Sequence, residues 1–333
     1  LGLATPTALM VGSGKGAENG ILIRNGAAIQ RMNEVTTVVF DKTGTLTMGK
    51  PKVTQVKPLS GIGENDLIRM AASIEKHSTH PLGVAIVQLA DEKQIGLDEA
   101  VNVQASAGKG ISGTFGSGII KVGSADFVGF NDELNEKGSQ VFIAVDDTVY
   151  GVFILADEMK ANASQVIQRL KSNHIKTVML TGDKQETADL LAKQIGIDEI
   201  YAEVLPEDKT HIIQTLQENG EIVCMLGDGI NDAAAIAQAD VGVAMGTGTD
   251  IAMETGDIIL VKGDLLKLNQ SFSLAKKTFR KIRQNLVWAS IYNCIAIPLA
   301  IFGVLHPVLA EAAMAISSIN VVGNSNRLRR ETL

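Results

Sequence analysis

Short apolar, β-branched runs alternate with amphipathic stretches over much of the chain. The runs predicted to form strands cover residues 37–40, 177–180, 222–226, 241–245 and 258–261. Helical periodicity covers residues 160–172, 184–195, 207–218 and 230–238. Strands that alternate with helices predict the α/β class, with a parallel sheet covered by helices on both faces. Such sheets bind ligands at the carboxyl ends of their strands, so polar residues directly after these runs are candidate site residues.

Two stretches do not follow the alternation. Residues 12–35 are glycine-rich at first and then carry apolar side chains at helical spacing, among them Ile21 and Ile23. Residues 51–150 mix a helical pair with short strands and glycines, which predicts a separate, inserted α+β domain. The expected boundaries are 1–30 for the end of a transmembrane helix and its connector, 31–50 and 151–265 for the α/β domain, and 51–150 for the insertion.

The last part of the chain changes character. Residues 286–305 carry no charge, and twenty such residues match the length of a membrane-spanning helix. A second apolar run, residues 308–323, follows His306 and Pro307. Basic residues lie at both outer ends, which places both ends of the hairpin in the cytosol. We expect membrane helices at 270–305 and 307–326 in an integral protein of the cell membrane; the alternative is a buried core hairpin.

Composition narrows the classes of partner. The net charge of −7 and the pI of about 5.3 argue against a nucleic acid as partner. Cys224 and Cys294 lie far apart and form no CxxC pair, which fits a reducing compartment.

The strongest chemical signal is the heptad Asp41-Lys42-Thr43-Gly44-Thr45-Leu46-Thr47 after the run 37–40. A carboxylate at the end of a buried strand, followed by a glycine turn with free amides, suits an aspartyl nucleophile aimed at phosphate. Three more segments follow predicted strands or open a helix: Thr181-Gly182-Asp183, Pro206-Glu207-Asp208-Lys209 and Gly227-Asp228-Gly229-Ile230-Asn231-Asp232. In order and type these motifs resemble the P-type ATPase branch of the haloacid-dehalogenase-like phosphotransferases.

The resemblance implies a Rossmannoid phosphorylation domain with an inserted nucleotide-binding domain, and a role for each motif residue. Asp41 would attack the γ-phosphate of ATP, and Lys209 would neutralise the transferring oxygens. The residues assigned to Mg²⁺ are Asp41, the carbonyl of Thr43, and Asp228, with Asp232 in support. The remaining assignments are Thr181 and Asn231 as hydrogen-bond donors to phosphoryl oxygens, Asp183 in domain closure, and Gly182 in nucleotide binding.

Thr43 marks a difference from many soluble phosphatases of this superfamily. Those carry a second aspartate two residues after the nucleophile, where it serves as acid and base during hydrolysis. A threonine cannot take up that proton, so the resemblance implies a long-lived phosphoenzyme. The family hydrolyses it with an actuator domain bearing Thr-Gly-Glu, a motif absent here, so we expect this chain to be phosphorylated without cycling properly.

The inserted region resembles the nucleotide-binding domain of class IB heavy-metal ATPases. Residues 73–82 match its SE-x-x-S-x-HP pattern, and Pro81 predicts a helix that starts directly after His80. Gly108 and Gly110 match its Gly-x-Gly element, where missing side chains let the backbone approach a nucleotide. The resemblance implies that Glu75, His80, Gly108 and Gly110 contact adenosine.

The two apolar runs near the end of the chain carry the evidence on which metal ion would be transported. Tyr292 and Asn293, with a proline five residues on, resemble the YN-x4-P element of copper transporters, and residues 314–318 match their M-x-x-S-S. Met314 and Ser318 share a helical face, and thioether sulfur suits Cu⁺. These residues also suit plain helix packing.

We therefore interpret the chain as the C-terminal portion of a class IB ATPase exporting Cu⁺, and Ag⁺ as well. Its start resembles the sequence just after the Cys-Pro-Cys site of that class, so the actuator and metal-binding domains would lie upstream. Expected partners are ATP, Mg²⁺, monovalent copper, the bilayer and a copper chaperone. The alternatives are a pump for Zn²⁺, Cd²⁺ or Co²⁺, a soluble-type phosphatase of the same superfamily, and a non-catalytic nucleotide-binding remnant.

Overall fold

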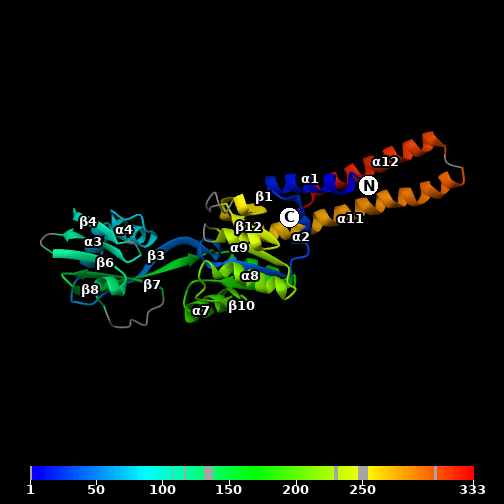
Figure 1. The fold of residues 1–333 in the computed structure, drawn as a ribbon. Helices are drawn as coiled ribbons and strands as arrows, with labels where there is room; N and C mark the ends of the chain where they lie inside the picture. Colours follow the sequence, from blue (N-terminus) through cyan, green and yellow to red (C-terminus); the bar gives the residue numbers. More distant parts are fainter. Residues whose placement is uncertain are drawn as a thin grey trace. The chain divides into compact units, whose positions relative to one another are not determined.

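The computed structural model describes residues 2–106, 108–115, 118–130, 138–228, 232–246, 254–303 and 306–333. The chain forms two compact units, each with a sheet of its own (Figure 1). One unit comprises Leu1–Leu46 and Lys160–Leu333, and the other comprises Thr47–Met159.

A seven-stranded sheet organises the first unit and confirms the predicted α/β class. Its strand order is β1 (Ile21–Ile23), β13 (Ile258–Leu260), β12 (Val241–Met245), β11 (Val223–Gly227), β2 (Thr37–Asp41), β9 (Lys176–Leu180) and β10 (Glu199–Tyr201). All neighbours are parallel except β1 and β13, which pair antiparallel. β2 is buried throughout and lies between β11 and β9, so its last residue, Asp41, is placed at the carboxyl edge of the sheet.

Helices cover this sheet on both faces, as parallel strands require. The helices of this unit are α1 (Ala4–Glu18), α2 (Gly26–Met32), α6 (Ala163–Ser172), α7 (Gln185–Ile195), α8 (Asp208–Glu218), α9 (Ala233–Gln238), α11 (Leu266–Ile301) and α12 (Pro307–Asn326), with single turns at Val261–Gly263 and Arg327–Arg330. α8 and α9 pack on one face through Ile213 and Ile236, which join a core with Val39, Val178 and Met225. α6 packs against β9 and contacts α7 and α11.

The helical spacing inferred at residues 21–23 is wrong, because this segment forms β1. Ile21 is fully buried and pairs with Leu260, and Ile23 pairs with Ile258. Three consecutive apolar residues fit either a helix or a strand. The side of β13 that does not pair with β12 offers backbone hydrogen-bond partners to this segment, and this tertiary contact decides the conformation.

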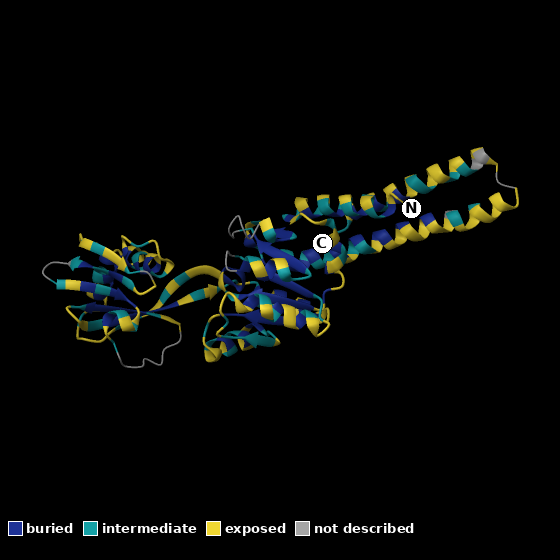
Figure 2. Ribbon diagram, viewed as in Figure 1, coloured by how far each residue is buried: buried dark blue, intermediate teal, exposed yellow. Residues whose placement is uncertain are grey.

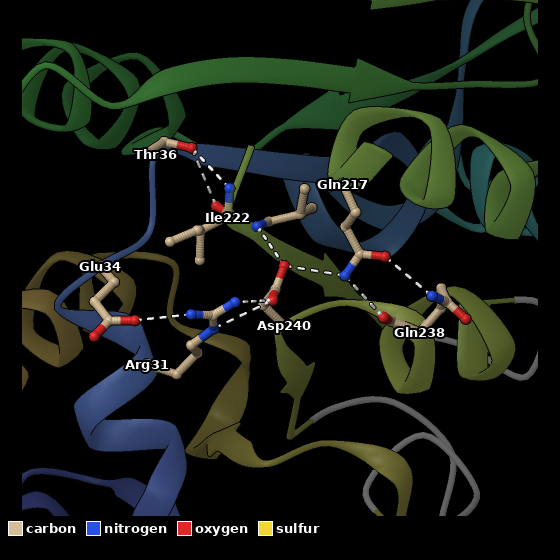
Figure 3. A network of polar contacts seen from close by, with 8 residues as sticks. Arg31, Glu34, Thr36, Gln217, Ile222, Gln238 and Asp240 are labelled. Carbon is tan, nitrogen blue, oxygen red and sulfur yellow. Dashed lines mark hydrogen bonds and ion pairs between the residues drawn. The ribbon is translucent and has the colours of Figure 1, made fainter. Parts of the chain in front are cut away.

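A polar network ties α2 to the amino ends of β11 and β12 (Figure 3). Asp240 accepts hydrogen bonds from the Arg31 guanidinium at 2.6 Å, the Gln217 amide at 3.0 Å and the Val223 N–H at 2.9 Å. Burial alone would raise the pKa of Asp240, but these donors outweigh it and lower the pKa. The network anchors the edge of the sheet opposite Asp41.

The second unit is an antiparallel sheet with helices packed on it. The strand order is β3 (Thr47–Pro58), β8 (Thr148–Met159), β7 (Ser139–Val145), β6 (Gly118–Gly123), β5 (Gly110–Phe115) and β4 (Val101–Ser106). The helices are α3 (Glu64–Glu75), α4 (Pro81–Glu92) and the single-turn α5 (Ala125–Val128). Leu67, Ile74 and Ile86 from α3 and α4 form its core with Ile120 and Phe153 from the sheet.

α11 and α12 form an antiparallel pair that also contacts α1 (Figure 1). Their apolar side chains remain exposed in their outer parts, in contrast to the buried sheet (Figure 2). Trp288 is 58% exposed, Ile295 58% and Ile319 69%. Among the described residues one helix, Leu266–Ile301, is long and apolar enough to cross a bilayer.

Candidate active site

Three strand or helix ends bring Asp41, Lys209 and Asp232 together. Asp41 ends β2, Lys209 lies in the first turn of α8, and Asp232 directly precedes α9. The Lys209 ammonium lies 2.7 Å from Asp41 Oδ1 and 2.7 Å from Asp232 Oδ1. All three residues are buried. Residues 41, 209 and 232 are far apart in sequence, so the parallel sheet assembles this charged cluster.

Burial and neighbouring charges shift the pKa values of Asp41, Asp228 and Lys209. Burial, with a further contribution from the Asp232 charge, raises the pKa of Asp41 to about 7 although Lys209 opposes the shift. Burial and Asp232 also raise the pKa of Asp228 to about 6. Burial would lower the pKa of Lys209, but the carboxylates of Asp41 and Asp232 outweigh it and raise the pKa. Such perturbation is typical of functional sites.

The donor set fits a hard divalent cation. One carboxylate oxygen from each of Asp41, Asp228 and Asp232 lies within 4.8 Å of the others. Oxygen ligands at this spacing suit Mg²⁺, and an added positive charge would offset the shared negative charge. Lys209 contacts both Asp41 and Asp232, so these contacts do not distinguish the ligands. The assignment of Asp41 and Asp228 as direct carboxylate ligands, with Asp232 in support, stays a prediction.

The loop after Asp41, Lys42–Leu46, presents backbone groups to this cluster. Thr43 has extended backbone angles (φ −74°, ψ 127°) and Gly44 has a positive φ of 72°. These angles are not helical, so the backbone of Lys42–Leu46 forms an irregular turn and not a helix. Gly44, Thr45 and Leu46 are buried, and the Thr45 hydroxyl has no hydrogen-bond partner among the described residues. A buried hydroxyl of this kind is available to a ligand.

Thr181 and Asp183 follow β9 at the same edge of the sheet. Thr181 is buried and its hydroxyl accepts the Asp183 N–H at 3.1 Å. The Asp183 carboxylate pairs with Lys42 at 2.7 Å, and Lys42 belongs to the loop after Asp41. Asn231, predicted as a phosphate ligand, lies outside the described residues, as do Gly229 and Ile230.

In the second unit, Glu75 and His80 flank the turn between α3 and α4. Burial raises the pKa of Glu75 to about 7, although a hydrogen bond with Ser78 opposes the shift. Pro81 opens α4 as the pattern predicts, and His80 caps the helix because its Nδ1 accepts the Leu82 N–H at 3.3 Å. With Nδ1 occupied, Nε2 is the free ring nitrogen of this exposed side chain. A buried acid with a perturbed pKa in this position is a candidate ligand-binding group.

Gly108 and Gly110 flank the start of β5. Gly108 has a φ of 70° and no atom within 4 Å of the position of a β-carbon. A β-carbon on Gly110 would lie 2.3 Å from the Val122 carbonyl oxygen, so Gly110 is required for the pairing of β5 with β6. The open space at Gly108 fits a nucleotide contact; the role of Gly110 in such a contact stays a prediction.

Known proteins with similar sequence or structure agree on one family. Residues 35–240 match the haloacid dehalogenase-like hydrolase family. The copper-exporting P-type ATPase of Staphylococcus haemolyticus is 45% identical over 346 residues, which cover 100% of this chain and 43% of that protein. The crystal structure of a zinc-transporting PIB-type ATPase in its E2.Pi state has a TM-score of 0.83 and 35% identity, covering 98% of this chain and 55% of that one. The catalytic domain of a CPx-ATPase has a TM-score of 0.69 and 36% identity, covering 79% of this chain and 98% of that domain.

The chain belongs to the haloacid dehalogenase-like hydrolase family, in its P-type ATPase branch. This confirms the resemblance inferred from the motifs. The chain spans less than half the length of the curated relative it matches. The cluster of Asp41, Lys209, Asp228 and Asp232 is thus the candidate phosphorylation site of a P-type ATPase.

The residues assigned to transported copper lie on α11 and α12. The structure describes Asn293 on α11, but not the side chain of Tyr292. Pro298 lies inside α11, where it cannot donate to the carbonyl one turn earlier. On α12, the Ser318 hydroxyl donates to the Met314 carbonyl at 3.0 Å, so the two residues share a face, and Met314 is 57% exposed. The copper assignment of all four residues stays a prediction.

Two lysines at the loop after Asp41 were not among the residues predicted for the site. Lys42 lies inside the recognised heptad, and its pairing with Asp183 could have been suspected from that position. Lys160 follows β8, and its ammonium donates to the carbonyl oxygens of Gly44 at 2.9 Å and Gly263 at 3.2 Å. Nothing in the local sequence distinguishes Lys160 from a solvated surface lysine.

Proposed function

We propose that this chain forms an aspartyl phosphate on Asp41 from ATP, as the catalytic portion of a pump that exports Cu⁺ and also Ag⁺. The observation that carries the proposal is the buried contact of Lys209 with both Asp41 and Asp232 at the edge of the sheet. Phosphoryl transfer needs positioning and charge neutralisation, and this cluster supplies both.

The proposed step forms a bond between an Asp41 oxygen and the γ-phosphorus and breaks the bond to the β–γ bridging oxygen, which leaves with ADP. Bound Mg²⁺ would neutralise charge on the phosphates, held by Asp41, Asp228 and the Thr43 carbonyl. Lys209 would turn its ammonium toward the transferring oxygens. Thr181 and Asn231 would donate hydrogen bonds to them, Asp183 would help to close the nucleotide-binding unit on the site, and Gly182 would contribute to nucleotide binding.

Nucleotide binding is proposed for the unit Thr47–Met159. Glu75 and His80 would contact the adenosine moiety, with Gly108 and Gly110 leaving room for it. The perturbed pKa of Glu75 and the free Nε2 of His80 support these roles. The membrane placement is a proposal as well: α11 and α12 would lie in the bilayer, with the seven-stranded sheet of the first unit and the whole second unit in the cytoplasm. An actuator domain, metal-binding domains and a copper chaperone would be partners.

A phosphorylation trap tests the proposal. The full chain is incubated with Mg²⁺ and γ-labelled ATP, quenched with acid and treated with hydroxylamine. We expect an acid-stable label that hydroxylamine removes and that Asp41→Asn abolishes, while Asp91→Asn, an exposed aspartate on α4, keeps it. Free phosphate without label would favour the phosphatase alternative, and neither label nor hydrolysis would favour the nucleotide-binding remnant.

The transported metal needs a separate test, because the neighbour of known structure transports zinc. Met314 offers a soft thioether to the proposed site, and this ligand favours Cu⁺ over Zn²⁺. We expect the full-length pump to show ATPase activity stimulated by Cu⁺ under reducing conditions and lost in Met314→Leu. Stimulation by Zn²⁺ alone would replace the copper assignment with the zinc alternative.

A further inference from the structure

Lys160 joins three segments of the first unit that are distant in sequence. Its ammonium donates to the carbonyl oxygen of Gly44 at 2.9 Å and to that of Gly263 at 3.2 Å. Its own N–H donates to the Leu46 carbonyl oxygen at 2.9 Å. Gly44 and Leu46 belong to the loop after Asp41, whereas Gly263 precedes α11. Lys160 therefore binds both the loop after Asp41 and the turn that precedes α11.

The next contacts extend the connection into α11. Asn162 Nδ2 donates to Asp264 Oδ1 at 3.2 Å. The same Asp264 oxygen accepts the Leu266 N–H at 3.0 Å. The backbone carbonyl oxygen of Asp264 accepts the Lys267 N–H at 3.1 Å. These bonds satisfy free amides of the first turn of α11, as a capping residue does. Residues 160–162 thus connect the loop after Asp41 to the first turn of α11.

The chemistry of the contact suits a lysine used for positioning. An ammonium that donates to two carbonyls makes charge-assisted hydrogen bonds, which are stronger than neutral ones. Gly44 adopts a positive φ, and its neighbour Thr43 supplies a proposed Mg²⁺ ligand through its carbonyl. A displacement of about 1 Å in such a loop is enough to slow a reaction that depends on alignment.

We propose that Lys160 is a positioning residue: it holds the loop Lys42–Leu46 in the shape that phosphoryl transfer requires and fastens this loop to the amino end of α11. The proposal rests on the function proposed for Asp41. It assigns Lys160 no contact with ATP or with the reacting atoms. Through Asp264, a shift of the first turn of α11 is transmitted to the loop beside the nucleophile, which links the proposed membrane helix to the phosphorylation site.

The test compares Lys160→Met with Lys160→Arg in the full chain, with Lys171→Met as the matched control. Lys171 also donates to a backbone carbonyl, that of Gly196 at 2.9 Å, and pairs with Asp198 at 2.6 Å. Hydrogen exchange is followed in residues 42–46 and 261–267, and the rate of label incorporation is measured at saturating ATP and Mg²⁺. The concentration of ATP giving half-maximal labelling is measured as well.

For Lys160→Met we expect exchange in both segments to rise and the labelling rate to fall by about tenfold or more, the scale of one charge-assisted hydrogen bond. The concentration of ATP that gives half-maximal labelling should stay unchanged, because the substitution lies outside the proposed nucleotide-binding unit. Lys160→Arg should restore most of the rate, and Lys171→Met should keep the wild-type rate. Asn162→Ala should raise exchange at 264–267 and leave 42–46 protected.

Three results would overturn the proposal. They are a labelling rate for Lys160→Met within about twofold of wild type, a comparable loss in Lys171→Met, and an exchange increase spread evenly over the unit. If Lys160→Met does not fold, unchanged exchange at 264–267 in Asn162→Ala overturns the link to α11. A wild-type chain that takes up no label contradicts the function proposed for Asp41, and the exchange data still decide whether Lys160 fastens the two segments.

Discussion

Gly44 lies against the carboxylate of Asp228: a β-carbon on Gly44 would fall 1.6 Å from Asp228 Oδ2. Gly44 also has a φ of 72°, a conformation that side chains rarely adopt. The backbone at Gly44, in the loop after Asp41, therefore lies too close to the carboxylate of Asp228 for any side chain to fit between them. This explains why a glycine follows Thr43 in the heptad.

Gly44→Ala is expected to abolish labelling of Asp41, with a loss of at least about 100-fold, because the methyl group displaces either the loop or the Asp228 carboxylate. Gly220→Ala is the matched control: Gly220 has a φ of 84° but open space around it. The control separates backbone strain from the clash. Equal losses of activity in the two variants would show that strain, and not the contact with Asp228, is responsible.

Removal of Lys209 is expected to destabilise the first unit. Lys209→Met leaves two buried carboxylates without their cation, and breaking a buried pair in this way costs about 3–5 kcal/mol. Asp232→Asn in the same chain should recover part of that stability without restoring labelling, because the interaction energy of neighbours is not additive. Urea unfolding and the phosphorylation trap measure the two effects. A free energy of unfolding of Lys209→Met equal to that of the wild type would show that Lys209 does not stabilise the buried carboxylates.

The raised pKa of Glu75 predicts that the stability of the second unit depends on pH. Its pKa is raised from 4.5 to about 7, so the folded state favours the protonated acid. The stabilisation is complete below about pH 4.5 and is lost as the pH rises to about 7, an effect on the order of 3 kcal/mol. Hydrogen exchange of α3, followed against pH, should show this slope in the wild type and not in Glu75→Gln.

The matched control for that slope is Glu64→Gln, because Glu64 is an exposed glutamate at the start of the same helix. The control should keep the wild-type dependence on pH. A wild-type slope that survives in Glu75→Gln would assign it to another group.

We expect His80 to bind the nucleotide in addition to capping α4. His80→Asn keeps a side-chain acceptor for the Leu82 N–H, since asparagine is a favourable capping residue. His80→Ala removes both the cap and the ring. Titration calorimetry should show weaker ATP binding in both variants, with unfolding affected mainly in His80→Ala. Unchanged affinity in His80→Asn would leave capping as the function of this residue.

Sequence patterns predicted the strands of the first unit well, because a buried parallel strand needs a continuous apolar run and the helices between strands need amphipathic periodicity. The β12 range matched, and β2, β9, β11 and β13 differed only at their ends. The short strand β10 was not predicted, and local pattern failed at β1, where pairing with β13 and not the sequence period decided the conformation. Periodicity reports the burial of side chains, whereas strand pairing depends on a partner distant in the chain.

The sequence by itself determined which chemical groups are available and at which strand ends they stand: Asp41, Lys209 and Asp228 were identified from motifs alone. Tertiary structure decided the contacts. It placed Lys209 between Asp41 and Asp232, pressed Gly44 against Asp228 and brought Lys160 to the loop beside the nucleophile. Distances between groups more than 100 residues apart follow from the packing of the sheet, and the raised pKa values of Asp41 and Asp228 follow mainly from the burial that this packing imposes.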